Sequence, residues 1–119
     1  MTAGSVLVVD DNDDIREVLA MVLEQEGYRV AHASNGRAAL EAVARGMPAL
    51  ILLDMKMPVM NGWEFAAELR RRYAESAPIV VISAAEDARR RAAEIGAQGW
   101  VGKPFDLSDF LAIVRRTLL

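Results

Sequence analysis

The sequence predicts an α/β domain built on a five-stranded parallel sheet with helices on both faces. Short apolar runs alternate with amphipathic helical stripes five times along the chain, and this alternation is typical of a parallel sheet covered by its own crossover helices. Residues 6–9, 50–53 and 79–82 are apolar at consecutive positions, as expected for strands buried on both faces. Such runs also occur in buried helices, but their shortness favours strands.

The composition limits the class of protein. The chain has 119 residues, of which 53% are hydrophobic and 26% are charged, so it has the size and apolar content of one globular domain. It contains no cysteine, which excludes disulfides, thiolate zinc sites and cysteine nucleophiles. A net charge of −3 disfavours a surface for nucleic acid.

Neither a signal sequence nor an apolar run of bilayer length is evident in the sequence. We therefore expect residues 1–119 to form a single cytoplasmic domain, with no effector domain in this chain. We also expect no membrane insertion and no direct contact with nucleic acid.

Periodicity predicts the first two strand–helix pairs. Residues 5–9 form a buried strand, and the apolar positions of residues 15–23 repeat with the spacing of a helix that ends at Gly27. Residues 28–33 alternate between apolar and other side chains, which is typical of a half-buried strand at the edge of a sheet. A short alanine-rich helix is predicted over residues 38–44.

Three further strand–helix pairs complete the chain. They are predicted at residues 50–54 with 63–73, 79–83 with 86–95, and 99–102 with 107–118. The helix over residues 86–95 has little bulk on its apolar side, so we expect it to be the most weakly held. Asp106 is the expected N-cap of the last helix. Right-handed crossovers and an edge position for the second strand give the flavodoxin-like strand order 2-1-3-4-5.

Polar side chains stand where these strands end. Asp10 and Asp11 follow the first strand, Asp54 ends the third, Ser83 ends the fourth and Lys103 ends the fifth. Each residue alone has an ordinary explanation, as a helix cap, a strand-end hydroxyl or a surface charge. Their joint position at the edge of the sheet where ligands bind is the informative fact.

Together these residues have the chemistry that phosphoryl transfer requires. Three clustered carboxylates repel one another and need a cation, and Mg²⁺, which Mn²⁺ could replace, prefers such oxygen ligands. Lys103 supplies a compact positive charge, and Ser83 supplies a hydrogen-bond donor for an anionic group. Asp54 would then act as a carboxylate nucleophile that takes the phosphoryl group as an acyl phosphate.

The motifs around these residues resemble those of the response-regulator receiver domain. They are Val8-Val9-Asp10-Asp11, Leu52-Leu53-Asp54-Met55-Lys56-Met57-Pro58-Val59-Met60-Asn61-Gly62, Ile82-Ser83-Ala84 and Lys103-Pro104-Phe105. The resemblance covers nearly the whole chain and implies phosphorelay signalling. Asp54 would accept a phosphoryl group from a phosphohistidine on a sensor histidine kinase or a histidine phosphotransfer protein. The downstream target is not identified by the sequence.

The resemblance also implies a metal site at Asp54. Asp11 and Asp54 would bind Mg²⁺ directly, together with the backbone carbonyl of Lys56, and Asp10 would assist through a water molecule. The chain would be a switch, not a turnover enzyme, that assists its own phosphorylation and dephosphorylation. Phosphorylation would change the conformation of the face formed by the fourth helix, the fifth strand and the fifth helix.

For the phosphoryl group itself, the resemblance implies that Ser83 and Lys103 hold it, and that the peptide between Lys103 and Pro104 is cis. The position three residues before this lysine usually carries Tyr or Phe as a rotating switch, and here it is Trp100. Trp100 either rotates in the same way or stays packed in one position on the edge strand, and the sequence leaves both interpretations open.

Two variable positions of the family bear on the lifetime of the phosphorylated state. Lys56 and Ala85 stand two residues after Asp54 and Ser83, respectively. In the family these positions tune how fast water removes the phosphoryl group. A cation at one and no polar group at the other should give little help to an attacking water, so we predict a lifetime of minutes or more.

Other residues are assigned to surfaces and packing. Ile15, Pro104 and Phe105 are predicted to form an apolar rim near Asp54, on which a helix of the kinase or phosphotransfer protein docks. The run of arginines at residues 89–91 is interpreted as a solvated helix face, and Trp63 as a side chain that packs on its own helix.

Three alternatives would use the same fold. A pseudo-receiver that only binds other proteins is disfavoured by the complete acidic set. An aspartyl-nucleophile Mg²⁺ phosphatase usually has a second carboxylate two residues after the nucleophile, where this chain has Lys56. A flavin or nucleotide carrier is disfavoured because neither glycine-rich phosphate-binding motif occurs.

Overall fold

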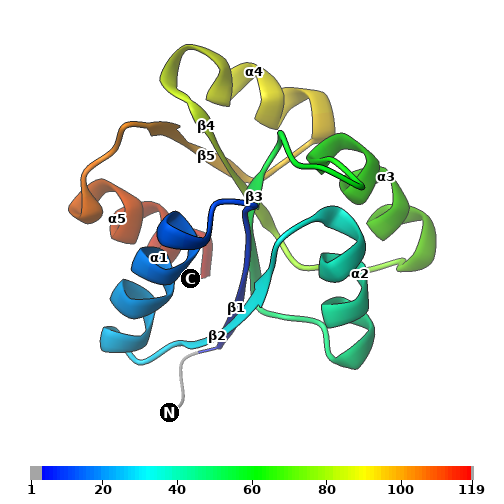
Figure 1. Cartoon of the computed structure of the whole chain (residues 1–119), viewed down its shortest axis with the longest axis horizontal. Coiled ribbons are helices and arrows are strands. Elements are labelled where there is room, and N and C mark those ends of the chain that lie inside the picture. The colour runs from blue at the N-terminus through cyan, green and yellow to red at the C-terminus, as the bar shows by residue number, and fades with distance from the viewer. Residues whose placement is uncertain (1–3, 119) are drawn as a thin grey trace.

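The computed structural model describes residues 4–118, which form five parallel strands with helices on both sides of the sheet (Figure 1). The strands are β1 (Ser5–Val9), β2 (Arg29–Ala33), β3 (Leu50–Asp54), β4 (Ile79–Ala84) and β5 (Gly99–Lys103). The helices are α1 (Asp13–Gln25), α2 (Gly36–Arg45), α3 (Gly62–Arg72), α4 (Ala85–Ile95) and α5 (Leu107–Leu118). The strand order is β2-β1-β3-β4-β5, so the predicted fold class and topology are confirmed.

The central strands are apolar at consecutive positions because both faces of the sheet are covered. Helices α1 and α5 lie on one face, and α2, α3 and α4 lie on the other (Figure 1). Leu7 and Ile51 are paired across β1 and β3 and pack towards α2 and α3. Their neighbours Val8 and Leu52 pack towards α1 and α5. No helix within residues 4–118 is both long enough and apolar enough to cross a bilayer.

Side-chain caps fix where several helices begin. The carboxylate of Asp106 accepts a hydrogen bond from the backbone N–H of Asp109 at 2.8 Å, which confirms the predicted cap of α5. Asn12 caps α1 in the same way, through the N–H of Ile15 at 3.1 Å. Asn61 caps α3 with a reciprocal hydrogen bond from its own N–H to the carboxylate of Glu64. Such caps satisfy N–H groups that a helix start leaves without partners.

Three helices begin earlier than the apolar periodicity predicts. Helix α2 starts at Gly36 rather than at Ala38, α3 starts at Gly62 rather than at Trp63, and α4 starts at Ala85 rather than at Glu86. For α2 and α3 the physical reason is the cap, because Asn35 and Asn61 each cap a helix that opens on a glycine, which has no side chain to mark the apolar face. Apolar spacing marks only the part of a helix that faces the core.

Candidate functional site

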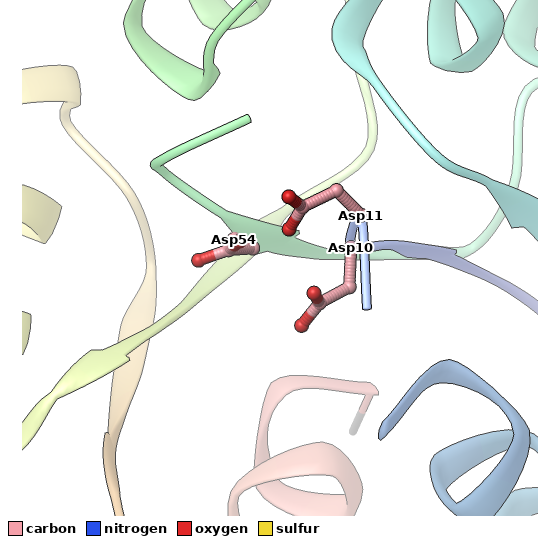
Figure 2. A group of neighbouring side chains, drawn as sticks. All are labelled: Asp10, Asp11 and Asp54. Atoms are coloured by element: carbon pink, nitrogen blue, oxygen red, sulfur yellow. The ribbon is translucent and has the colours of Figure 1, made fainter. Parts of the chain in front are cut away.

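Three carboxylates meet at the carboxyl edge of the sheet. Asp10 follows β1 directly and is 2% exposed, and Asp54 is the last residue of β3 and is 9% exposed. The parallel register pairs Val9 with Leu53, so both strands deliver their aspartates at the same level. One carboxylate oxygen from each of Asp10, Asp11 and Asp54 lies within 4.8 Å of the other two. Figure 2 shows the three carboxyl groups gathered beyond the ends of these two strands.

The loop after β1 is held in place by a hydrogen bond from its own backbone and by the side chain of an arginine. The N–H of Asn12 donates to Oδ1 of Asp10 at 2.9 Å. Arg16 of α1 donates through Nη1 to the backbone carbonyl of Asp10 at 2.7 Å and pairs through Nη2 with Asp13 at 2.6 Å. These contacts fix Asp10 while Asp11 stays at the surface. Sequence reasoning did not assign Arg16 to the site.

Burial and like charges act on Asp54. The pKa of Asp54 is raised from 3.8 to about 6, mainly by burial and also by the nearby Asp10 and Asp11, while Lys103 and a backbone hydrogen bond from Lys56 act in the opposite direction. An anionic Asp54 is therefore costly beside two other carboxylates. An oxygen-only donor set of this charge fits a hard divalent cation such as Mg²⁺, so the residues present suit the ion that the sequence predicts.

Lys103 is the cation nearest to these carboxylates. Its Nζ lies 3.5 Å from Oδ2 of Asp10 and 3.9 Å from Oδ1 of Asp54. The peptide bond between Lys103 and Pro104 is cis. Ser83 is buried at the end of β4, and its register partner is Gly102, directly before the lysine. The fourth and fifth strands thus bring the predicted hydroxyl and ammonium groups to the same edge as Asp54.

A cavity of about 190 Å³ opens beside Asp54. Three residues that the sequence assigned to the site line this cavity, namely Ser83, Lys56 and Lys103. Two residues of α4 also line it, Asp87 and Arg91, and sequence reasoning did not place them there. The interpretation of Arg91 as part of a solvated face is wrong, because its side chain is only 11% exposed. The four-residue spacing from Asp87 to Arg91 was the available signal, since it puts these two side chains on the same side of the predicted helix.

Trp63 explains the burial of Arg91. The guanidinium carbon of Arg91 lies 4.9 Å from the centroid of the Trp63 ring, a cation–π contact. Nε1 of Trp63 donates to the carboxylate of Glu94 at 3.0 Å. Arg70 of α3 adds hydrogen bonds to the carbonyls of Ile95 and Gly96. Trp63 therefore connects α3 to α4 rather than packing only on its own helix, and polar contacts supplement the small apolar face of α4.

The remaining predicted residues lie around the cavity or away from it. Ala85 is the exposed first residue of α4, and a side chain on Gly102 would collide with its backbone. Lys56 is exposed at the start of the loop after β3. Trp100 is 46% exposed and lines a surface groove over β5 and α5, not the cavity beside Asp54. The structure thus records an outward position of the Trp100 ring.

The three predicted docking residues come together in an apolar concavity. Ile15 of α1 and Pro104 and Phe105 after β5 line a space of about 620 Å³, with Val18 and Leu107 also exposed around it. Phe105 stacks on the buried Phe110, with ring centroids 5.7 Å apart. Ala84 and Lys103 line both this concavity and the cavity beside Asp54.

Relatives in sequence match nearly the whole length of this chain. The uncharacterized transcriptional regulatory protein YkoG of Bacillus subtilis is 35% identical over 120 residues, covering 99% of this chain and 52% of that protein. The transcriptional regulatory protein SrrA of Staphylococcus aureus is 36% identical over 121 residues, covering 97% of this chain and 49% of SrrA. The chain thus spans about half the length of these curated relatives.

Solved structures and a family model agree with these relatives. The chemotaxis response regulator CheY4 of Vibrio cholerae superposes with a TM-score of 0.87 at 34% identity, covering 98% of this chain and 100% of CheY4. NtrX of Brucella abortus, crystallised with ATP, gives a TM-score of 0.89 at 29% identity, covering 98% of this chain and 27% of NtrX. The family model of the response regulator receiver domain matches residues 6–115, and the chain therefore belongs to the receiver domains of two-component response regulators.

Proposed function

We propose that this receiver domain is a phosphorylation switch in which Asp54 accepts a phosphoryl group from a phosphohistidine. The donor is a sensor histidine kinase or a histidine phosphotransfer protein, and the reaction depends on a divalent cation such as Mg²⁺. One observation carries the proposal: Asp10, Asp11 and Asp54 share one space at the edge of the sheet, and the ammonium group of Lys103 reaches into that space.

The proposed chemistry is a simple displacement. An oxygen of the Asp54 carboxylate forms a bond to phosphorus while the phosphorus–nitrogen bond of the phosphohistidine breaks, and the imidazole nitrogen leaves with the bonding electron pair. Bound Mg²⁺, held by Asp11, Asp54 and the carbonyl of Lys56 with Asp10 acting through water, would neutralise charge on the phosphoryl oxygens. Above its pKa of about 6, Asp54 is a carboxylate and can act as the nucleophile.

Lys103 and Ser83 are the proposed holders of the transferred group. Lys103 already faces the cavity beside Asp54 and is balanced there by Asp10 and Asp54. When Asp54 is phosphorylated, the ammonium group of Lys103 gains a more highly charged partner, because the phosphoryl group of the acyl phosphate carries about −2 charge where the carboxylate carried −1. Ser83 can donate a hydrogen bond from the same end of the neighbouring strand β4. Electrostatic stabilisation of this kind is the main requirement of phosphoryl transfer.

The donor is proposed to dock on the apolar concavity formed around Ile15, Pro104 and Phe105. This concavity shares Lys103 and Ala84 with the cavity beside Asp54, so a helix bound there would hold its histidine next to the acceptor. Amphipathic helices commonly bind apolar grooves. The downstream consequence is a population shift in the face formed by α4, β5 and α5, where Trp100 lies exposed.

Mass spectrometry of the intact protein tests the proposal. Incubation with Mg²⁺ and acetyl phosphate should add one phosphoryl group to the wild-type chain and none to Asp54→Asn or to protein treated with a chelator. Absence of an adduct with acetyl phosphate and with phosphohistidine donors would favour a pseudo-receiver. Continuous release of phosphate from many phosphate esters would instead indicate a phosphatase.

A further inference from the structure

One wall of the cavity beside Asp54 is formed by α4. Asp87 and Arg91 line this wall, and Asp54 and Lys103 line the same space of about 190 Å³. A cavity of this size is about large enough for a phosphoryl group and a few water molecules. Arg91 therefore borders the space that a phosphoryl group on Asp54 would enter.

Arg91 is held at this wall by two contacts. Its guanidinium carbon lies 4.9 Å from the centroid of the Trp63 ring, and its Nη2 lies 3.4 Å from Oδ2 of Asp87. Trp63 is fixed in turn by its hydrogen bond to Glu94. Only 11% of the Arg91 side chain is exposed, so little solvent has to be removed before the guanidinium can bind an anion inside the cavity.

Asp87 does not depend on Arg91 for its charge balance. Nη2 of Arg90 lies 2.6 Å from Oδ1 of Asp87, whereas the contact from Arg91 to the other oxygen is long, at 3.4 Å. If Arg91 turned away, Asp87 would remain paired with Arg90. Guanidinium–phosphate hydrogen bonds are charge-assisted and often bidentate, so a phosphoryl group would be a stronger partner for Arg91 than Asp87 is.

We propose that Arg91 is a further ligand of the phosphoryl group, and that it changes partner from Asp87 to the phosphoryl oxygens when Asp54 is phosphorylated. This inference rests on the proposed phosphorylation of Asp54. It adds the planar donor fork of an arginine to the single ammonium charge of Lys103. As the guanidinium moves, its contact with the Trp63 ring changes, so the α3–α4 connection also responds to phosphorylation.

Fluorescence of Trp63 provides the test. The chain has two tryptophans, so Trp100→Phe leaves Trp63 as the only reporter. In this background, Arg91→Gln is compared with the control Arg90→Gln. Arg90 also pairs with Asp87, but its side chain is exposed. Each protein is saturated with Mg²⁺ and then phosphorylated with acetyl phosphate, so that only the phosphoryl-dependent change in emission is measured. A third variant, Arg91→Lys, keeps a cation but not the fork.

The parent and the Arg90→Gln variant should change their Trp63 emission on phosphorylation, and the Arg91→Gln variant should not. The rise in Tm on phosphorylation should also be smaller in Arg91→Gln, by about 4 °C, because a charge-assisted hydrogen bond to the phosphoryl group is missing. Arg91→Lys should give an intermediate response.

Intact mass measured on the same samples separates the two hypotheses. If Arg91→Gln carries the adduct and responds as Arg90→Gln does, Arg91 stays on Asp87 and the inference is overturned while the proposed function stands. If the parent chain forms no adduct, the proposed function itself is overturned, and the role of Arg91 with it.

Discussion

Lys103 stands between two concavities of opposite character. On the side of α1, an apolar concavity of about 620 Å³ is open at the surface. On the side of α4, a cavity of about 190 Å³ is lined by charged side chains, among them Asp54, Asp87 and Arg91. The difference indicates a division of roles, since an apolar surface suits a protein helix and a charged enclosure suits a small anion. Substitutions that affect one side and spare the other can test this division.

The largest expected effect is on the charged side and appears as a gain in stability. Asp54→Asn should raise the free energy of unfolding of the metal-free protein by up to about 3 kcal/mol at pH 7.5, because asparagine mimics the neutral carboxyl. The pKa of Asp54 is raised from 3.8 to about 6 in the folded state, so its ionisation costs stability. This cost develops as the pH rises from about 4 to about 6, and below that range the two proteins should be equally stable.

Denaturant unfolding at several pH values, with and without Mg²⁺, measures this effect. Mg²⁺ should stabilise the wild-type protein more than Asp54→Asn and so reduce the difference. Asp14→Asn, at an exposed position in the same acidic region, is the matched control and should be neutral. A difference for Asp54→Asn that does not vary with pH would contradict the proposed cause.

The next effect tests the apolar side. Phe105→Ala removes a large side chain from the concavity and should slow phosphoryl transfer from a phosphohistidine protein by about tenfold or more, because buried aromatic anchors carry much of the binding energy of interfaces. Labelling by acetyl phosphate should be nearly unchanged, since this small donor needs only the charged side. The ratio of the two rates, measured by intact mass or by radioactive phosphate, is the decisive quantity.

Two further variants control this experiment. Ile15→Ser alters another residue that lines the same concavity and should change the ratio in the same direction. Met47→Ala removes an exposed apolar side chain that does not line the concavity and should leave the ratio unchanged. Because Phe105 stacks on Phe110, the Tm of each variant shows whether folding is preserved. An equal loss of rate with both donors would contradict the division between the two sides.

The strand ends could be predicted from sequence because they follow from simple patterns. Apolar runs placed Asp54 and Ser83 at the ends of buried strands, and parallel topology brought these ends to one edge. The wall formed by α4 could not be predicted in the same way. Arg91 lies in a run of three arginines, and only the position of Trp63 on another helix decides which of the three is buried.

The backbone conformation of the loop after β3 also could not be predicted from the local sequence. Val59 has a φ of +67° and is 74% exposed, although a β-branched residue rarely adopts a positive φ. The conformation is closed by a hydrogen bond from the N–H of Met60 to the carbonyl of Pro58 at 2.7 Å. Gly36 then donates to the carbonyl of Met60 at 2.8 Å. Contacts with a distant segment thus accompany a backbone shape that the local sequence does not favour.

The smallest expected effect concerns Lys56, which lines the charged cavity. We expect the wild-type phosphoprotein to persist for minutes or more, and Lys56→Asn to shorten its lifetime by about threefold to fivefold. Asparagine can orient an attacking water, an assistance comparable to weak general-base catalysis, whereas an ammonium group cannot accept a proton from that water.

Lys56→Met is the control, because it removes the same charge without adding a polar group. Loss of label is followed after removal of the donor. Shortening in Lys56→Met as large as in Lys56→Asn would mean that the charge of Lys56, not the orientation of water, sets the lifetime. Decay of the wild-type label within seconds would show that the cavity admits and activates water without help from position 56.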